Sequence, residues 1–346
     1  MRFSPVPSES REKINEAGKI LASDNPTQQE RTWALDLAER WRACHAYPIN
    51  TFQATLRDKT RNFQGEPIVA QRLKRMPTII DKLRRYPSMS LSRMQDIGGV
   101  RAILGSFTDV ERLAHQYLKN QNFTHELSTV RDYITNPRDE DGYRSLHLVY
   151  KYRNPRNPDF DGLRLEMQLR TRRQHIWATA VETMGFVLKE PLKSRRGSQA
   201  WIDFFAILAS AFAHQEGTPL VPRFAHLNYD ETIKELARVE KDLGALIMIS
   251  GVSAAAEHIL KNQKGSSYHL LVLDTNKRTV NVKGYDRDSF AAAEKDYSYF
   301  EKRIQDGEDL EPVLVSAGPI DRLRSAYPNF FLDIRDLEKA VRELLS

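Results

Sequence analysis

The stretch LRLEMQLRT, residues 163–171, alternates apolar and polar side chains. Successive side chains on a β-strand point to opposite faces, so this pattern predicts a half-buried strand. Its apolar residues would face the core, whereas Glu166, Gln168 and two arginines would share the other face. Packing does not require an acid, an amide and two cations on one strand face. The pattern therefore predicts a polar site on the surface of a sheet.

Two further blocks place polar residues beside predicted strands. In RMQDIGGVR, residues 93–101, Asp96 precedes the apolar run 100–104. In DGYRSLH, residues 141–147, the same period of two puts Tyr143 and His147 on one face, just after a glycine that releases the chain from a loop. One carboxylate at each of two strand edges is a common way to hold Mg²⁺, which prefers oxygen ligands. Together the three blocks predict a metal-dependent phosphoryl-transfer site.

Basic side chains that could hold the phosphates are concentrated in residues 71–85. This segment is expected to form a helix interrupted by Pro77. Arginine suits stacking on a base and forked phosphate contacts, and lysine acts as a point charge. The six cations are Arg72, Lys74, Arg75, Lys82, Arg84 and Arg85.

The remaining patterns predict an α+β chain. Strands are expected at residues 100–106, 123–133, 145–152, 163–171, 268–274, 279–285 and 312–317. Helices are expected at residues 11–22, 28–46, 90–95, 172–189, 199–215, 230–261, 288–305 and 333–345. The segment 217–222 contains two prolines and a glycine, which predicts a linker between two domains, 1–222 and 223–346.

Composition limits the class of protein. The single cysteine, Cys44, excludes a disulfide framework or a zinc cluster. No secretory signal is evident, and the longest apolar run, residues 244–256, is too short to cross a membrane. We therefore expect a cytoplasmic protein. Residues 1–222 hold 34 Lys and Arg against 25 Asp and Glu, whereas residues 223–346 hold 18 against 21. A basic first part suits a polyanionic substrate.

In these blocks the chain resembles the synthetase domain of the RelA/SpoT alarmone synthetases, over roughly residues 41–190. The resemblance implies a nucleotidyltransferase-like fold, a mixed sheet flanked by helices, which moves pyrophosphate from ATP to a 3′-hydroxyl. It implies that Asp96 binds Mg²⁺ and that Glu166 either binds the metal or activates the attacking hydroxyl. It also implies an ATP site in which Arg72 and Arg101 sandwich the adenine and Lys74 and Lys82 contact the phosphates.

The resemblance also implies an acceptor site. Tyr143 would stack on the acceptor base. Beside it would lie His147, His175 and Gln168. Gln168 is also counted among the catalytic residues. Guanosine alarmone synthetases often carry a four-residue signature ahead of the acceptor loop. The corresponding stretch here, TVRD at residues 129–132, keeps Arg131 but lacks the first arginine of the basic version.

Residues 223–346 are not expected in an ordinary small alarmone synthetase. They look similar to the fused toxin–antitoxin members of the family, the CapRel type, in which a C-terminal domain restrains the synthetase and senses a phage capsid protein. A Tyr-x-x-Tyr element of that domain fills the adenine site, and the nearest match here is YPNF at residues 327–330. Tyr327 and Phe330 are therefore candidates for autoinhibition, with ordinary core packing as the alternative.

The resemblance leaves the acceptor open. The 3′-terminal adenosine of tRNA is preferred, because related toxins modify it and thereby block translation. The alternative within the enzyme class is synthesis of a guanosine or adenosine alarmone. An alternative of another class is a catalytically inert module that senses nucleotide or nucleic acid. The presence of Asp96, Tyr143, His147 and Glu166 argues against it, because an inert domain would not need to keep them.

Overall fold

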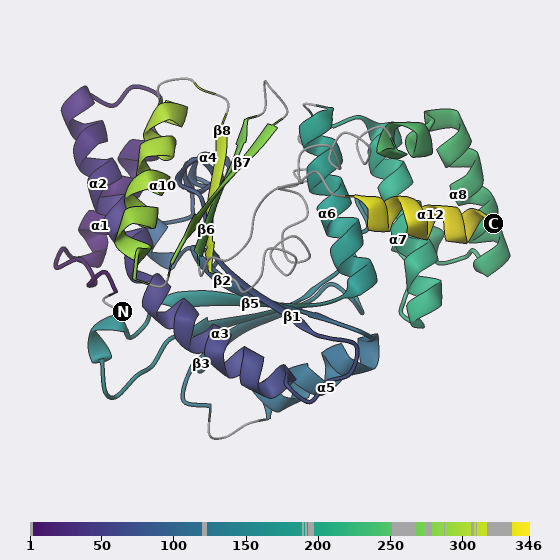
Figure 1. Ribbon diagram of the computed structural model, residues 1–346, viewed down its shortest axis with the longest axis horizontal. Coiled ribbons are helices and arrows are strands. Elements are labelled where there is room, and N and C mark those ends of the chain that lie inside the picture. Colours follow the sequence, from purple (N-terminus) through teal and green to yellow (C-terminus); the bar gives the residue numbers. More distant parts are fainter. Residues whose placement is uncertain are drawn as a thin grey trace.

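The computed structural model describes residues 3–119, 123–188, 197–250, 268–274, 279–286, 288–305, 310–316 and 334–346, together with the single residues 190, 192 and 308. Its described elements form a five-stranded sheet with helices, a three-stranded sheet that lies beside it, and a helical group (Figure 1). None of the described helices is long and apolar enough to cross a membrane.

The five-stranded sheet is mixed, which confirms the α+β fold. Its strands follow the order β1-β2-β5-β4-β3, and they are β1 (Ile68–Leu73), β2 (Gly98–Leu104), β3 (Glu126–Asp132), β4 (Leu146–Lys151) and β5 (Arg164–Thr171). β2 and β5 pair in parallel, and the other neighbours pair antiparallel. Leu163, Leu165, Met167 and Leu169 are buried, as the alternation predicts.

Helices from the first part of the chain share a hydrophobic core with this sheet. They are α1 (Arg11–Ala22), α2 (Gln28–Cys44), α3 (Ala46–Thr60), α4 (Met76–Arg85) and α5 (Phe107–Leu118). Helices α3 and α5 were not predicted from the sequence. Ile49, Phe52 and Leu56 of α3 recur at helical spacing and are buried, so the periodicity was present. Because α3 begins two residues after α2 ends, the two helices read as one segment.

Three predicted helices need correction. Residues 71–85 are not one interrupted helix, because the end of β1 and the whole of α4 divide them, and Arg72 lies on the strand. Pro77 lies at the start of α4, where a missing N–H is tolerated. Residues 90–95 contain only a short 3₁₀ helix, Leu91–Arg93. The helix predicted at 230–261 is interrupted at Gly244, whose φ of 65° is left-handed; residues 245–250 are again helical, and residues 251–261 lie outside the described residues.

Helices α6 (Arg172–Val187), α7 (Gln199–Glu216), α8 (Tyr229–Leu243) and α12 (Arg335–Leu345) form a second core together with the helical residues 245–250. They form the group on the right of Figure 1. Val221 is buried within this core, and the backbone carbonyl of Pro219 accepts a hydrogen bond from Arg144. The predicted boundary at residue 222 therefore falls inside one packed unit.

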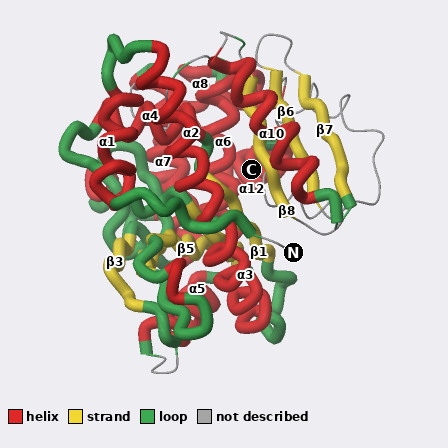
Figure 2. Tube along the Cα trace, turned by 90° about the vertical axis from the view of Figure 1, so that its left-hand side faces the viewer, coloured by secondary structure: helices red, strands yellow, loops and turns green. Residues whose placement is uncertain are grey.

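The remaining described elements form a small antiparallel sheet covered by one helix. The sheet has the order β7-β6-β8, with β6 (Tyr268–Asp274), β7 (Thr279–Tyr285) and β8 (Leu310–Ser316). Helix α10 (Phe290–Gln305) packs on β6 and β8, as Figure 2 shows from the side. The candidates for autoinhibition, Tyr327 and Phe330, lie outside the described residues.

Gly142 is expected to be essential for the loop that carries Tyr143. Its φ is +76°, and a Cβ atom there would lie 2.8 Å from Cβ of Ala209. We expect Gly142→Ala to lower the free energy of unfolding by about 2–4 kcal/mol, measured by urea denaturation. Gly217 also has a positive φ, but nothing lies within 4 Å of its added Cβ. Gly217→Ala should therefore cost only about 1 kcal/mol, and equal costs would contradict the crowding at Gly142.

Candidate functional site

One face of the five-stranded sheet carries the predicted polar residues. Antiparallel pairing places Arg72 opposite Gly99, and parallel pairing places Gly99 beside Glu166. The same registers align the next row across β2, β5 and β4, which consists of Arg101, Gln168 and His147. Paired residues project to the same face of a sheet. These side chains line a cavity of about 270 Å³ together with Lys74, Asp96, Arg131, Arg138, Tyr143, Arg170 and Trp177.

Asp96 pairs with two lysines at one end of this cavity. Its Oδ2 atom accepts hydrogen bonds from Nζ of Lys74 and Nζ of Lys82, each at 2.9 Å. Burial alone would raise the pKa of Asp96, but the two lysines outweigh it and lower that pKa. Burial lowers the pKa of Lys74 to about 8, although Asp96 opposes this shift. The aspartate is therefore held ionised between two cations.

The other oxygen of Asp96 is the best candidate for a metal contact. In the part of the chain that the structure describes, Asp96 Oδ1 is buried and has no hydrogen-bond partner. No group of three or more His, Cys, Asp and Glu side chains gathers as a metal site among the described residues. Mg²⁺ commonly uses one or two carboxylates and takes its other ligands from water and substrate phosphates. The orphaned oxygen fits that requirement.

Glu166 is fixed by two donors. Its Oε1 atom lies 2.9 Å from Nδ1 of His147, and its Oε2 atom accepts a 2.7 Å hydrogen bond from Gln168. Burial would raise the pKa of Glu166, but His147 and Gln168 outweigh it and hold that pKa well below its usual range. Burial would lower the pKa of His147, yet Tyr143 and Glu166 raise it. Each of the two buried side chains therefore favours the charged form of the other.

Tyr143 extends this network toward the loop. Its hydroxyl lies 2.8 Å from Nε2 of His147 and accepts a 2.5 Å hydrogen bond from Arg170. The Arg138 guanidinium lies over the ring, 4.4 Å from its centroid. Burial would raise the pKa of Tyr143, but Arg170 and His147 outweigh it and lower that pKa to about 7. Arg170 and His147 therefore polarise the Tyr143 hydroxyl.

The other predicted residues divide into two groups. Arg101 donates a 3.4 Å hydrogen bond to Gln168, and Arg131 donates a 3.0 Å hydrogen bond to Gln95 while lining the cavity. His175 is buried in α6, and the described residues that line this cavity do not include it. Arg138 and Trp177 were not predicted as site residues. Arg170 was expected on the polar face of the strand, since it continues the alternation of Glu166 and Gln168, but without a specific role.

The segment that carries these residues is similar to known proteins. Residues 71–185 match the model of the region found in RelA / SpoT proteins. A GTP pyrophosphokinase of Bacillus subtilis, YjbM, is 30% identical over 140 residues, which are 38% of this chain and 65% of that protein. Uncharacterized protein Rv1366 of Mycobacterium tuberculosis is 34% identical over 125 residues, 35% of this chain and 40% of that protein.

One solved structure is similar to part of the chain. Small alarmone synthetase 1 from Bacillus subtilis is 22% identical and has a TM-score of 0.43, over 53% of this chain and 93% of that chain. Among these comparisons, the family model relates residues 71–185 to the region found in RelA / SpoT proteins. The matches do not include the whole chain, and it spans less than two thirds of these curated relatives.

Proposed function

We propose that the chain is a pyrophosphokinase that transfers the β- and γ-phosphoryl groups of ATP, as one unit, to a 3′-hydroxyl. The arrangement of Asp96 with Lys74 and Lys82 carries this proposal, because it combines a free buried carboxylate oxygen with two cations. The family match of residues 71–185 and the relatives named GTP pyrophosphokinase support it.

The chain's own residues would mainly bind and orient the substrates. Lys74 and Lys82 would contact the phosphates, while Arg72 and Arg101 on neighbouring strands would hold the adenine. Mg²⁺, bound by Asp96 and Glu166 when present, would neutralise charge on the phosphates. In the reaction a bond forms between the acceptor O3′ and the β-phosphorus, the bond from that phosphorus to the α–β bridging oxygen breaks, and AMP leaves. Such transfers depend mostly on placement and electrostatics.

Glu166 would act on the acceptor hydroxyl. Because its pKa lies well below the usual range, Glu166 is ionised at neutral pH and can accept a hydrogen bond from that hydroxyl. The hydroxyl becomes strongly acidic only as its bond to phosphorus forms, so the proton can move late. His147 would hold Glu166 in place, and Tyr143 would in turn orient His147 and contact the acceptor base.

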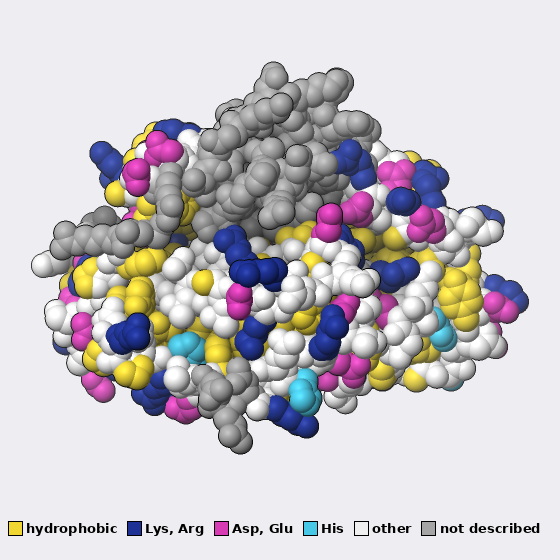
Figure 3. All heavy atoms as spheres, turned by 60° about the horizontal axis from the view of Figure 1, so that its bottom comes forward, with side chains coloured by type: hydrophobic (Ala, Val, Ile, Leu, Met, Phe, Trp, Pro, Cys, Tyr) yellow, Lys and Arg dark blue, Asp and Glu magenta, His cyan; other side chains and the backbone are white. Residues whose placement is uncertain are grey.

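For the acceptor we propose the 3′-terminal adenosine of tRNA. The excess of Lys and Arg over Asp and Glu in residues 1–222, and the arginines that line the cavity, support a polyanionic acceptor. On the face in Figure 3, however, Lys and Arg side chains are interspersed with Asp and Glu. A guanosine nucleotide is the second candidate, supported by the names of two relatives. An adenosine nucleotide is the third candidate acceptor and would bind in the same cavity.

Regulation is a further part of this proposal. Inhibition by the segment that contains Tyr327 and Phe330, its release by a phage protein and a role in phage defence all rest on the sequence resemblance. If the segment inhibits, Tyr327→Ala should raise the rate of transfer and the toxicity on expression. Unchanged rate and growth would reject this part and leave the proposed chemistry intact.

The acceptor can be identified directly. The protein would be incubated with ATP labelled in the β-phosphate and, separately, with GDP, GTP, unlabelled ATP or deacylated tRNA. Label on tRNA alone would support the tRNA proposal. Label on a guanosine or adenosine nucleotide, but not on tRNA, would reject it in favour of alarmone synthesis. Absence of label from every acceptor, with the wild type and with Tyr327→Ala alike, would favour an inert sensing module.

A further inference from the structure

A buried carboxylate on α10 connects the C-terminal part of the chain to the segment that carries both lysines. Glu301 has an exposed side-chain fraction of 1%. Its Oε2 atom accepts a 3.0 Å hydrogen bond from Arg42 of α2. Its Oε1 atom accepts one from the Tyr297 hydroxyl at 2.8 Å and one from the backbone N–H of Met76 at 3.1 Å. One side chain therefore joins α2, α4 and α10.

The contact between Glu301 and Met76 caps the N-terminus of α4, which has no other side-chain cap from the preceding residue. Helix α4 begins at Met76, and the preceding residue, Arg75, makes no side-chain capping hydrogen bond. The first N–H groups of a helix have no partner within it, and Pro77 has no N–H at all. Glu301 supplies an acceptor for the first of these groups from 225 positions further along the chain. Its negative charge also lies at the positive end of the helix dipole, which favours it.

The position of Met76 determines where the two lysines lie. Lys82 belongs to α4, and Lys74 precedes Met76 by two residues. The Lys74 N–H donates a 2.7 Å hydrogen bond to the carbonyl of Ile97, which lies between Asp96 and the start of β2, so this end of the segment is already anchored. The other end is held by the buried side chains of α4 and by the Glu301 cap. A shift of Met76 would move both ammonium groups relative to Asp96.

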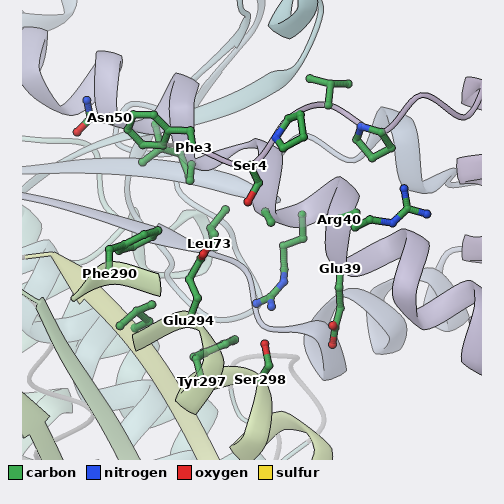
Figure 4. A pocket seen from close by; sticks show the side chains of 18 of the residues that line it. Phe3, Ser4, Glu39, Arg40, Asn50, Leu73, Phe290, Glu294, Tyr297 and Ser298 are labelled. Atoms are coloured by element: carbon green, nitrogen blue, oxygen red, sulfur yellow. The ribbon is translucent and has the colours of Figure 1, made fainter. Parts of the chain in front are cut away.

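Beside this connection α10 is not packed tightly against the first part of the chain. A cavity of about 680 Å³ separates α10 from α2, α3 and β1, and its walls include Arg42, Arg72 and Tyr297. Figure 4 shows Phe290, Glu294 and Tyr297 projecting from the α10 side of this cavity. Next to such an open region, the Glu301 cluster is a localised point of attachment.

We propose that Glu301 is a positioning residue for the ATP phosphates: from the C-terminal part of the chain it holds the start of α4 so that Lys74 and Lys82 meet Asp96. The inference rests on the proposed function, since it assigns the lysines to ATP. It gives α10 a supporting role in the site, which is separate from inhibition by the segment that contains Tyr327.

Two double variants separate the helix cap from the buried charge pair. In the first, Arg42→Met with Glu301→Gln, the glutamine oxygen can still accept from Met76, although the ion pair is gone. In the second, Arg42→Met with Glu301→Met, both the ion pair and the acceptor are gone. Removing both charges avoids leaving one buried ion without its partner, which is strongly destabilising. The full-length chain is used in each case.

Steady-state kinetics give the main readout. The variant with methionine at both positions should raise KM for ATP by about tenfold over the variant that keeps glutamine, with kcat changed less than about threefold, because the lysines bind the phosphates before and during reaction. A general loss of folded protein would lower the apparent kcat and leave KM unchanged. Equal KM values in the two folded variants would overturn the proposal.

Amide hydrogen exchange supplies a readout that needs no activity. The Met76 N–H should exchange slowly in the wild type and in the glutamine variant, and at least about tenfold faster in the methionine variant. Fast exchange in the wild type would overturn the proposal even if neither variant folds. If neither the wild type nor Tyr327→Ala transfers pyrophosphate although Met76 exchange differs as expected, the proposed function fails and the cap remains as a structural contact only.

Discussion

Asp96→Asn is expected to lower the rate of pyrophosphate transfer by about 10³-fold or more while the protein stays folded. The substitution keeps the shape of the side chain but removes the charge that holds Lys74 and Lys82 together. It also replaces the orphaned anionic oxygen with a neutral group that binds Mg²⁺ weakly. Initial rates at saturating ATP over a range of Mg²⁺ concentrations would measure the effect, and circular dichroism would confirm folding.

The matched control lies on the same helix as Lys82. Asp81 is exposed and pairs with Arg85 of α4 at 2.8 Å, so removal of its charge changes the local sequence in the same way without touching the cavity. Exposed pairs of this kind contribute little to stability. Asp81→Asn should therefore stay within about twofold of the wild-type rate. Retention of more than a tenth of wild-type activity by Asp96→Asn would refute the assignment of that carboxylate to the reaction centre.

Glu166→Gln is expected to lower kcat by about 10²–10³-fold, with a smaller change in KM for ATP. The charged oxygen that faces the acceptor hydroxyl is lost, and His147 loses the anion that stabilises its protonated form. The effect should appear in single-turnover rates, because the proposed role concerns the transfer step itself. The predominance of a kcat effect distinguishes this role from a contact that only binds ATP.

An exposed glutamate on the same sheet serves as the control. Glu126 of β3 pairs with Lys151 and with Arg153, the latter at 3.0 Å, at a solvent-facing position. Glu126→Gln should leave single-turnover rates within about twofold of wild type. If Glu166→Gln behaves like Glu126→Gln, Glu166 has no part in the chemistry, and the acceptor hydroxyl must be activated by another group.

Strands with clear alternation could be predicted from the sequence, whereas β1 could not. In β5, apolar and polar residues alternate because one face packs on the helices and the other lines the site. In β1 apolar residues occur on both faces of the strand, and Arg72 lies between polar and apolar neighbours, so no period of two is visible. Pro77 was interpreted as an interruption of a helix, although proline in the first turn commonly marks a helix start.

The site residues were found because several local patterns pointed to one chemistry, but their partners depend on contacts between distant segments. The pairing of Glu166 with His147 follows from the register of β4 and β5. The contact of Glu301 with Met76 joins positions that no local pattern relates. Helix α12 likewise packs with α6 and α8, so the second core could not be derived from periodicity along the chain.

The most direct test of the central claim follows the three phosphates of ATP separately. ATP labelled in the α-, β- or γ-phosphate would be incubated with the wild-type protein and each acceptor, and the products would be separated. For every acceptor other than ATP, pyrophosphate transfer requires that β- and γ-labels move together to the acceptor in equal amounts and that the α-label of the consumed ATP appears only in AMP. Transfer of the γ-label alone, or of the α-label, would contradict pyrophosphate transfer.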